Sequence, residues 1–286
     1  MVVQHRRTGG AVAAVAVLGA MAVGGCSAVG AGPADGGPGH ETVHGQAGQV
    51  ADGRSGEVRT AADTLIAAGS ARTRTEMESA AGGTRVTIRA AGGYDFTRRE
   101  GRLTVVLPKD PAGTDDRRPV TELLTPGALY MKNRGAGVPA DKWVRIDTTT
   151  LADGNLVTGG ATDPLAAAEL LRSARNVVLL GEERLDGVTV RHYRGDADIA
   201  RAALAAPPHA RASLAAAAKG FATDAVPFDA YLDEQGRLRK VRHRFSFANG
   251  RGAVAVTSTT LLYDFGAPVT VRLPDRRDIY AGKIRG

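Results

Sequence analysis

The chain has 286 residues, of which 43% are hydrophobic and 23% are charged, and its formal net charge is +7. This length fits one domain of about 230 residues behind a leader and a linker, which is large enough to bury a core. The basic residues are interleaved with acidic ones and do not gather in one stretch, which argues against a nucleic-acid-binding protein. Because aromatic residues make up only 5% of the chain, alanine, valine and leucine must supply most of the core.

Residues 1–25 have the pattern of a secretory signal peptide. Arg6 and Arg7 give it a positive start, residues 11–23 form an apolar stretch, and small residues precede Cys26. A membrane-spanning helix needs about 20 apolar residues, and this stretch is shorter and interrupted by glycine. Removing the leader takes away two arginines and no acidic residue, which lowers the net charge from +7 to +5.

The only cysteine of the chain, Cys26, closes the run Val23-Gly24-Gly25-Cys26. This run resembles the lipobox of bacterial lipoproteins. The resemblance implies cleavage between Gly25 and Cys26 and transfer of a diacylglyceryl group to the Cys26 sulfur. Two acyl chains would hold the protein durably on the extracytoplasmic face of a membrane. The alternatives are an uncleaved anchor, an ordinary secreted signal and a buried structural cysteine, and export by the Sec or the twin-arginine route stays open.

Residues 26–56 are dominated by glycine, alanine, proline and aspartate. A segment with so few bulky apolar residues cannot bury enough surface to fold, which predicts a disordered tether behind the lipidated cysteine. His40 and His44 lie four residues apart, a spacing that suits two metal ligands on one helix face, but Gly39 and Gly45 disfavour such a helix. The sequence therefore predicts no metal site and no cofactor.

Residues 57–286 are predicted to form one folded domain. Its first element is an amphipathic helix, because Val58, Leu65 and Ile66 share one face and Gly69 can end it. From Ala71 onward the apolar period changes to two, which predicts strands. Turns are expected at Gly82-Gly83, Gly92-Gly93, Glu100-Gly101, Pro126-Gly127 and Asp186-Gly187.

Helices interrupt the strands in the second half of the chain. Asp163-Pro164 is a helix start, with aspartate at the cap and proline at the first position. Two alanine-rich helices are expected over residues 198–204 and 208–219. Strands over residues 226–232, 238–247 and 253–263 follow. The whole predicts an α+β fold with a large, mostly antiparallel sheet of about 11 strands. The twist of so many strands accumulates, so the sheet should curl into a half-barrel.

No residue pattern in the folded part predicts catalysis. A hydrolase needs a nucleophile, a base and an orienting acid, and no Gly-x-Ser-x-Gly elbow occurs. His209 follows Pro208 at a helix start, while His192 and His243 each share a strand face with apolar residues. A histidine in such a place is usually a satisfied core residue, and a polar contact to a ligand is the alternative. We predict that the chain is not an enzyme.

Several short segments of the folded part carry a family resemblance. They are Leu129-Tyr130-Met131-Lys132, Lys142-Trp143-Val144-Arg145-Ile146-Asp147, Asp163-Pro164, Leu185-Asp186-Gly187-Val188, His192-Tyr193-Arg194-Gly195, Val226 to Asp233, and Tyr263 to Val269. Their succession resembles the LppX/LprG-type lipoproteins of high-GC Gram-positive bacteria, which share the half-barrel of the LolA and LolB lipoprotein carriers. The resemblance covers about residues 57–274. It implies helices across the concave side of the sheet and an apolar cavity for acyl chains.

The side chains predicted to face the inside of the sheet are candidates for a cavity lining or for a filled core. They are Thr73, Thr75, Met77, Val86, Ile88, Val241, His243, Phe245, Phe247 and Leu261. Our leading hypothesis is a membrane-anchored extracytoplasmic lipoprotein that binds or carries a lipid or other amphiphile. The alternative is a non-enzymatic surface or sensory module with a solid core that docks a protein or cell-wall partner. The sequence does not indicate which protein that partner would be.

Overall fold

A computed structural model describes residues 53–81, 84–108, 118–134, 137–151, 153–157, 163–248 and 253–282. The predicted signal peptide, Cys26 and most of the predicted tether lie outside these ranges. Residues 53–59 are already helical, so the described fold begins slightly before residue 57. No helix in the described part of the chain is long and apolar enough to cross a membrane.

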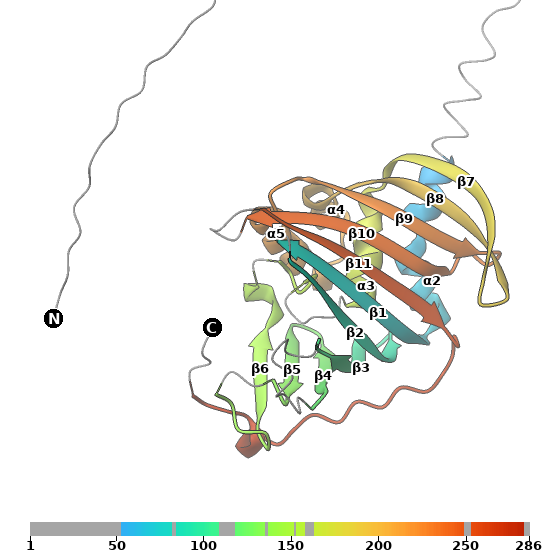
Figure 1. Cartoon of the computed structure of the whole chain (residues 1–286). Helices are drawn as coiled ribbons and strands as arrows, with labels where there is room; N and C mark the ends of the chain where they lie inside the picture. Colours follow the sequence, from blue (N-terminus) through green and yellow to red (C-terminus); the bar gives the residue numbers. More distant parts are fainter. Residues whose placement is uncertain are drawn as a thin grey trace, which may run out of the picture. The chain divides into compact units, whose positions relative to one another are not determined.

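Eleven antiparallel strands form one sheet, in the order β6-β5-β4-β3-β2-β1-β11-β10-β9-β8-β7. The first and last strands of the described residues pair at the centre, and further strands are added on both sides of this pair (Figure 1). The strands are β1 (Ser70–Ala81), β2 (Thr84–Asp95), β3 (Glu100–Val106), β4 (Val120–Thr125), β5 (Ala128–Lys132), β6 (Trp143–Asp147), β7 (Arg175–Leu185), β8 (Val188–Asp198), β9 (Ala225–Asp233), β10 (Leu238–Ala248) and β11 (Ala253–Tyr263). The predicted α+β half-barrel is confirmed.

The helices lie together on one side of the curved sheet (Figure 1). They are α2 (Ala61–Ala68), α3 (Pro164–Leu170), α4 (Ile199–Ala205) and α5 (Pro208–Gly220), with short 3₁₀ helices η1 (Thr148–Thr150), η2 (Leu171–Ser173) and η3 (Arg276–Asp278). We call the helix-covered side of the sheet the concave face and the opposite side the convex face. The C-terminal segment follows the end of the strands from β11 to β6, where the Tyr280 amide donates to the Trp143 carbonyl at 2.8 Å.

Local sequence signals explain several boundaries. The Asp163 carboxylate accepts hydrogen bonds from the amides of Leu165 and Ala166, which caps α3 as expected. Asp186 and Gly187 both have left-handed backbones, at φ 47° and 82°, and form the tight turn between β7 and β8. The predicted turn at Gly82-Gly83 lies outside the described residues.

The predicted turn at Gly92-Gly93 is wrong, because β2 runs straight through both glycines. A Cβ atom on Gly92 would collide with the backbone carbonyl of Arg102 on the neighbouring strand β3. Gly92 therefore permits close approach of a second backbone within a strand. The chain turns a few residues later, where Arg99 has a left-handed backbone at φ 58°.

Candidate functional site

The concave face of the central strands is built from alternating side chains of β1, β11 and β10. Thr75 pairs with Thr260, which pairs in turn with Val241. One row further along, Met77 pairs with Ser258 and Ser258 with His243. All six of these side chains are buried. This face therefore combines aliphatic side chains with a stripe of small polar ones at the middle of the sheet.

Most of the predicted lining residues lie on this face. Thr73, Thr75, Met77, Val241, His243 and Phe245 are buried there, and Val86 and Ile88 are partly buried beside them on β2. Phe247 belongs to β10, but its side chain lies outside what the structure describes.

Leu261 lies on the opposite, convex face, which corrects the sequence-based assignment. It pairs with the exposed Arg74, whereas its neighbour Leu262 pairs with the buried Thr73. Two adjacent leucines leave the inward residue ambiguous from the sequence, because a one-residue shift exchanges the two faces of a strand.

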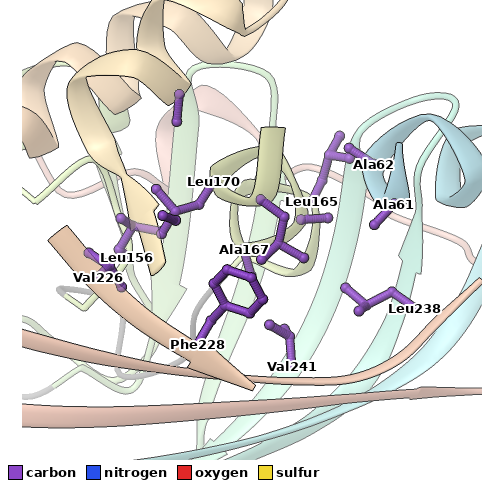
Figure 2. Close-up of a cluster of buried hydrophobic side chains, with 14 of the residues drawn as sticks. Ala61, Ala62, Leu156, Leu165, Ala167, Leu170, Val226, Phe228, Leu238 and Val241 are labelled. Carbon is purple, nitrogen blue, oxygen red and sulfur yellow. The ribbon is translucent and has the colours of Figure 1, made fainter. Parts of the chain in front are cut away.

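Side chains from the helices fill much of the space over the concave face (Figure 2). Phe228 of β9 and Val241 of β10 point toward Leu165 and Ala167 of α3 (Figure 2). Close packing of this kind is typical of protein interiors. In this conformation, the candidate lining residues belong to a packed core.

Three polar atoms on the central strands of the concave face have no hydrogen-bond partner although they are buried. They are the hydroxyl oxygens of Thr73 and Thr75 and Nε2 of His243. Burial lowers the pKa of His243 to about 3, so the imidazole is neutral at physiological pH. Burying polar atoms without partners costs free energy. A polar group of a ligand that formed hydrogen bonds with this stripe would offset that cost.

Glu122 of β4 is a further buried polar residue on the same face, and sequence reasoning missed it. It lies between Leu103 of β3 and Met131 of β5, and neither carboxyl oxygen has a partner. Burial raises its pKa to about 8, so the carboxyl is protonated at neutral pH. The sequence did contain a signal, because Glu122 shares the period-two face of Val120 and Leu124.

A cavity of about 70 Å³ lies where α3 and α5 meet the turn between β4 and β5. Its polar lining includes Tyr94, whose hydroxyl donates to the Asp163 carboxylate at 3.2 Å. Burial raises the pKa of Asp163 above its ordinary value. The cavity is also lined by Asn155, whose side-chain oxygen has no partner, and by His209, whose pKa burial lowers. The sequence had identified Asp163 only as a helix cap and His209 only as a residue at a helix start.

This cavity is small compared with known ligand sites. Pockets for small molecules usually have volumes of roughly 300–1,000 Å³. A volume of about 70 Å³ holds a few water molecules or one small polar group, but not an acyl chain. Binding of a long apolar ligand would therefore require the helix layer to move.

The convex face carries an open depression of about 480 Å³. Arg74, Arg89 and Lys240 line it together with Leu261 and Val106. It is several times larger than the cavity beside α5.

His192 also belongs to the convex face, and its imidazole is fully engaged. Nδ1 lies 2.7 Å from the Glu183 carboxylate, Nε2 lies 3.0 Å from the Asp229 carboxylate, and the ring stacks on Tyr231 at 4.1 Å between centroids. The described residues contain no group of three or more His, Cys, Asp or Glu side chains that could hold a metal ion. His40 and His44 lie outside those residues.

No family model matches the sequence, and no curated protein matches it either. Among solved structures, the chain is similar to lipoprotein LppX of Mycobacterium tuberculosis, with 12% identity, a TM-score of 0.46, and coverage of 77% of this chain and 99% of LppX. It is similar to LprF of Mycobacterium bovis, with 12% identity, a TM-score of 0.43, and coverage of 78% and 97%. A putative lipoprotein-sorting domain of Vibrio parahaemolyticus gives 9% identity, a TM-score of 0.30, and coverage of 75% and 92%. These similarities carry no information about a ligand.

Proposed function

We propose that this chain is a lipid-anchored extracytoplasmic protein that binds a lipid or other amphiphile between the concave face of the sheet and the helices above it. The apolar part of the ligand would lie against the aliphatic side chains of the central strands. Its polar part would meet either the stripe around His243 or the small cavity beside α5. The proposal involves no catalytic step.

The observation that carries the proposal is the weak attachment of α5. Only Leu214 and Ala217 are buried among its 13 residues. The helix packs chiefly against α4, with smaller contacts to η1 and α3. Exposing Leu214 costs about 1.5–3 kcal/mol, and exposing Ala217 and the partly buried Ala210, Ala215 and Ala218 adds at most about 0.8 kcal/mol for each. Burying ten methylenes of an acyl chain contributes about 8 kcal/mol. An acyl chain therefore has enough binding energy to displace α5 and enlarge the cavity beneath it.

Membrane anchoring is the second part of the proposal, and it rests on the sequence around Cys26. Replacing Cys26 by alanine should move the protein from the membrane fraction to the soluble fraction or the medium, which cell fractionation would detect. Unchanged partitioning of the variant would contradict the lipid anchor.

A different function remains supported by one observation, the packed interior. If the core stays solid, the chain is a binding or sensory module whose protein or cell-wall partner docks outside. The convex depression around Arg74, Arg89 and Lys240 would then be a natural place for that contact.

Lipid content separates the two functions. We expect native mass spectrometry and solvent extraction of the full chain, purified in detergent, to reveal a bound amphiphile. Ala217→Trp should reduce its amount several-fold, because the indole would occupy the space beneath α5. Ala212→Trp is the matched control, since Ala212 is exposed on the same helix. Absence of any amphiphile from the wild-type protein would favour the solid-core module.

A further inference from the structure

The edge strand β7 exposes three consecutive large apolar side chains. Val178, Leu179 and Leu180 are 46%, 38% and 47% exposed. Edge strands of soluble proteins usually carry charges or proline at such positions, which protects them from unwanted association. An uncharged apolar run at a sheet edge therefore indicates a surface that contacts another molecule or a membrane when the protein functions.

These side chains project to both faces of the sheet. Val178 pairs with Arg194 of the convex face, whereas Leu179 pairs with Tyr193, whose side chain reaches the concave side. β7 is an edge strand of the sheet: it pairs with β8 on one side, and no strand of the described sheet pairs with its other side. A partner resting on one face would leave part of the run in water, whereas a bilayer interface can surround the whole edge.

The N-terminal end of the described chain lies beside this edge (Figure 1). Arg59 Nε donates to the carbonyl of Ala174, the residue directly before β7, at 2.8 Å. Glu57 accepts hydrogen bonds from Tyr193 and Arg191 of β8. Cys26 lies 27 residues before Gly53, the first described residue. The chain that leads back to the proposed lipid anchor thus leaves the domain next to the exposed apolar run.

We infer that the β7 edge around Val178, Leu179 and Leu180 is a membrane-contact surface that enters the interfacial layer of the bilayer. The inference rests on the proposed anchoring of Cys26.

Charged side chains and free backbone groups limit how deeply the β7 edge can enter the bilayer. The exposed Glu182 and Glu183 follow the apolar run on β7 and must remain hydrated. The free backbone groups of an edge strand also need water or headgroup partners, so the strand cannot enter the hydrocarbon core. The contact therefore places aliphatic side chains at the level of the upper acyl chains while the backbone stays among the headgroups. It would hold the domain with its β7 edge toward the membrane from which an amphiphile would come.

Site-specific fluorescence tests this contact in the full lipidated chain. Because acylation consumes the thiol of Cys26, a cysteine introduced at position 179 is the only one free for a polarity-sensitive fluorophore. The labelled Leu179→Cys protein is reconstituted in phosphatidylcholine/phosphatidylglycerol vesicles that contain a lipid with a nitroxide on its upper acyl chain. We expect quenching several-fold stronger than for Val106→Cys and Leu273→Cys. These two controls replace apolar residues that are more exposed than Leu179, at 53% and 52% against 38%, and that lie away from β7.

A second variant tests whether the apolar side chains cause the contact. Leu180→Glu in the Leu179→Cys background should lower quenching to the level of the controls, whereas Val106→Glu in that background should not. Circular dichroism should show that both variants remain folded. Equal quenching at all three labelled positions would overturn the inference. The inference would also be overturned if the fluorescence change at position 179 depended on the amount of protein per vesicle and not on the amount of nitroxide lipid. That result would indicate that the β7 edges of two protein molecules pair with each other.

The failure of the anchor can be told apart from the failure of this contact. If washing removes the unlabelled wild-type protein from the vesicles, the proposed lipidation is wrong. If that protein stays bound but the label at position 179 is not quenched, only the membrane-contact surface is wrong.

Discussion

Two buried carboxyl groups on opposite faces of the same sheet have pKa values shifted in opposite directions. Glu122 on the concave face has no hydrogen-bond partner, and burial raises its pKa to about 8. Asp229 on the convex face is contacted by His192, Arg194 and Arg244 at 3.0, 2.9 and 2.8 Å. Burial alone would raise the pKa of Asp229, but these partners outweigh it and lower the pKa.

For these two residues, the convex face stabilises the charged carboxylate and the concave face keeps the carboxyl neutral. His243 fits the same division, because its pKa of about 3 leaves it uncharged on the concave face. A neutral, water-poor face suits the apolar part of an amphiphile, whereas a charged ligand would find partners on the other side.

The largest effect is expected for the packing of the concave face. Phe228→Ala should lower the free energy of unfolding by about 3–5 kcal/mol, because it leaves a cavity in the buried core. The convex control Val106→Ala should change it by less than about 0.5 kcal/mol. Urea denaturation measures both values. A small loss for Phe228→Ala would mean that the interior is loosely filled.

Glu122 should make the protein less stable as the pH rises. The unfolded carboxyl ionises near pH 4.3 and the folded one near 8, so stability falls between these values and the loss is complete above pH 8. At pH 7 the loss is on the order of 3 kcal/mol. Glu122→Gln should remove this slope, whereas Glu182→Gln on the exposed part of β7 should retain it. An unchanged slope in Glu122→Gln would show that Glu122 has a partner or is hydrated.

His243 should produce the opposite slope at lower pH. Its folded pKa of about 3 lies below the unfolded value near 6.5, so the contribution is complete above pH 6.5 and is lost as the pH falls toward 3. The Glu122→Gln background lacks the opposing slope of Glu122, and there we expect a loss on the order of 2 kcal/mol between pH 6.5 and pH 5. Thermal unfolding of the double variant Glu122→Gln/His243→Leu should lack this decline. If the decline persists in the double variant, another group causes it.

Asp229 should contribute the least, although it has the most partners. Asp229→Ala should cost about 1–2 kcal/mol at pH 7, because Arg194 and Arg244 are partly exposed and water replaces their lost contacts. Since its pKa is lowered, the contribution is present above the unfolded pKa near 3.9 and is lost as the pH falls through the folded pKa. Urea titrations of wild type and variant should converge below that pH. A constant difference would assign the effect to packing and not to charge.

Local signals predicted much of the fold. The cap at Asp163, the turn at Asp186-Gly187 and the period-two strands specify elements through contacts between near neighbours. The turn expected at Gly92-Gly93 is wrong because Gly92 permits the close approach of the Arg102 backbone, which depends on strand pairing. The same limitation applies to Leu261, whose face depends on its register with β1.

The site was harder to predict than the fold. The inward positions of Thr73, Thr75 and Met77 followed from strand alternation. Whether such side chains line a cavity or fill a core depends on how the helices cover them, which no local pattern encodes. The cavity beside α5 combines residues that are distant in sequence, such as Tyr94, Asn155 and His209. Only the folded arrangement brings these residues together.

Photo-crosslinking with a diazirine fatty acid tests the division between the two faces most directly. After irradiation of the full chain, peptide mass spectrometry locates each adduct at residue level. Binding beneath the helices predicts adducts at Leu214 and Ala217 of α5 and at concave-face residues such as Phe245. Adducts confined to the convex depression around Arg89 and Lys240, or no specific adduct at all, would contradict the proposed site.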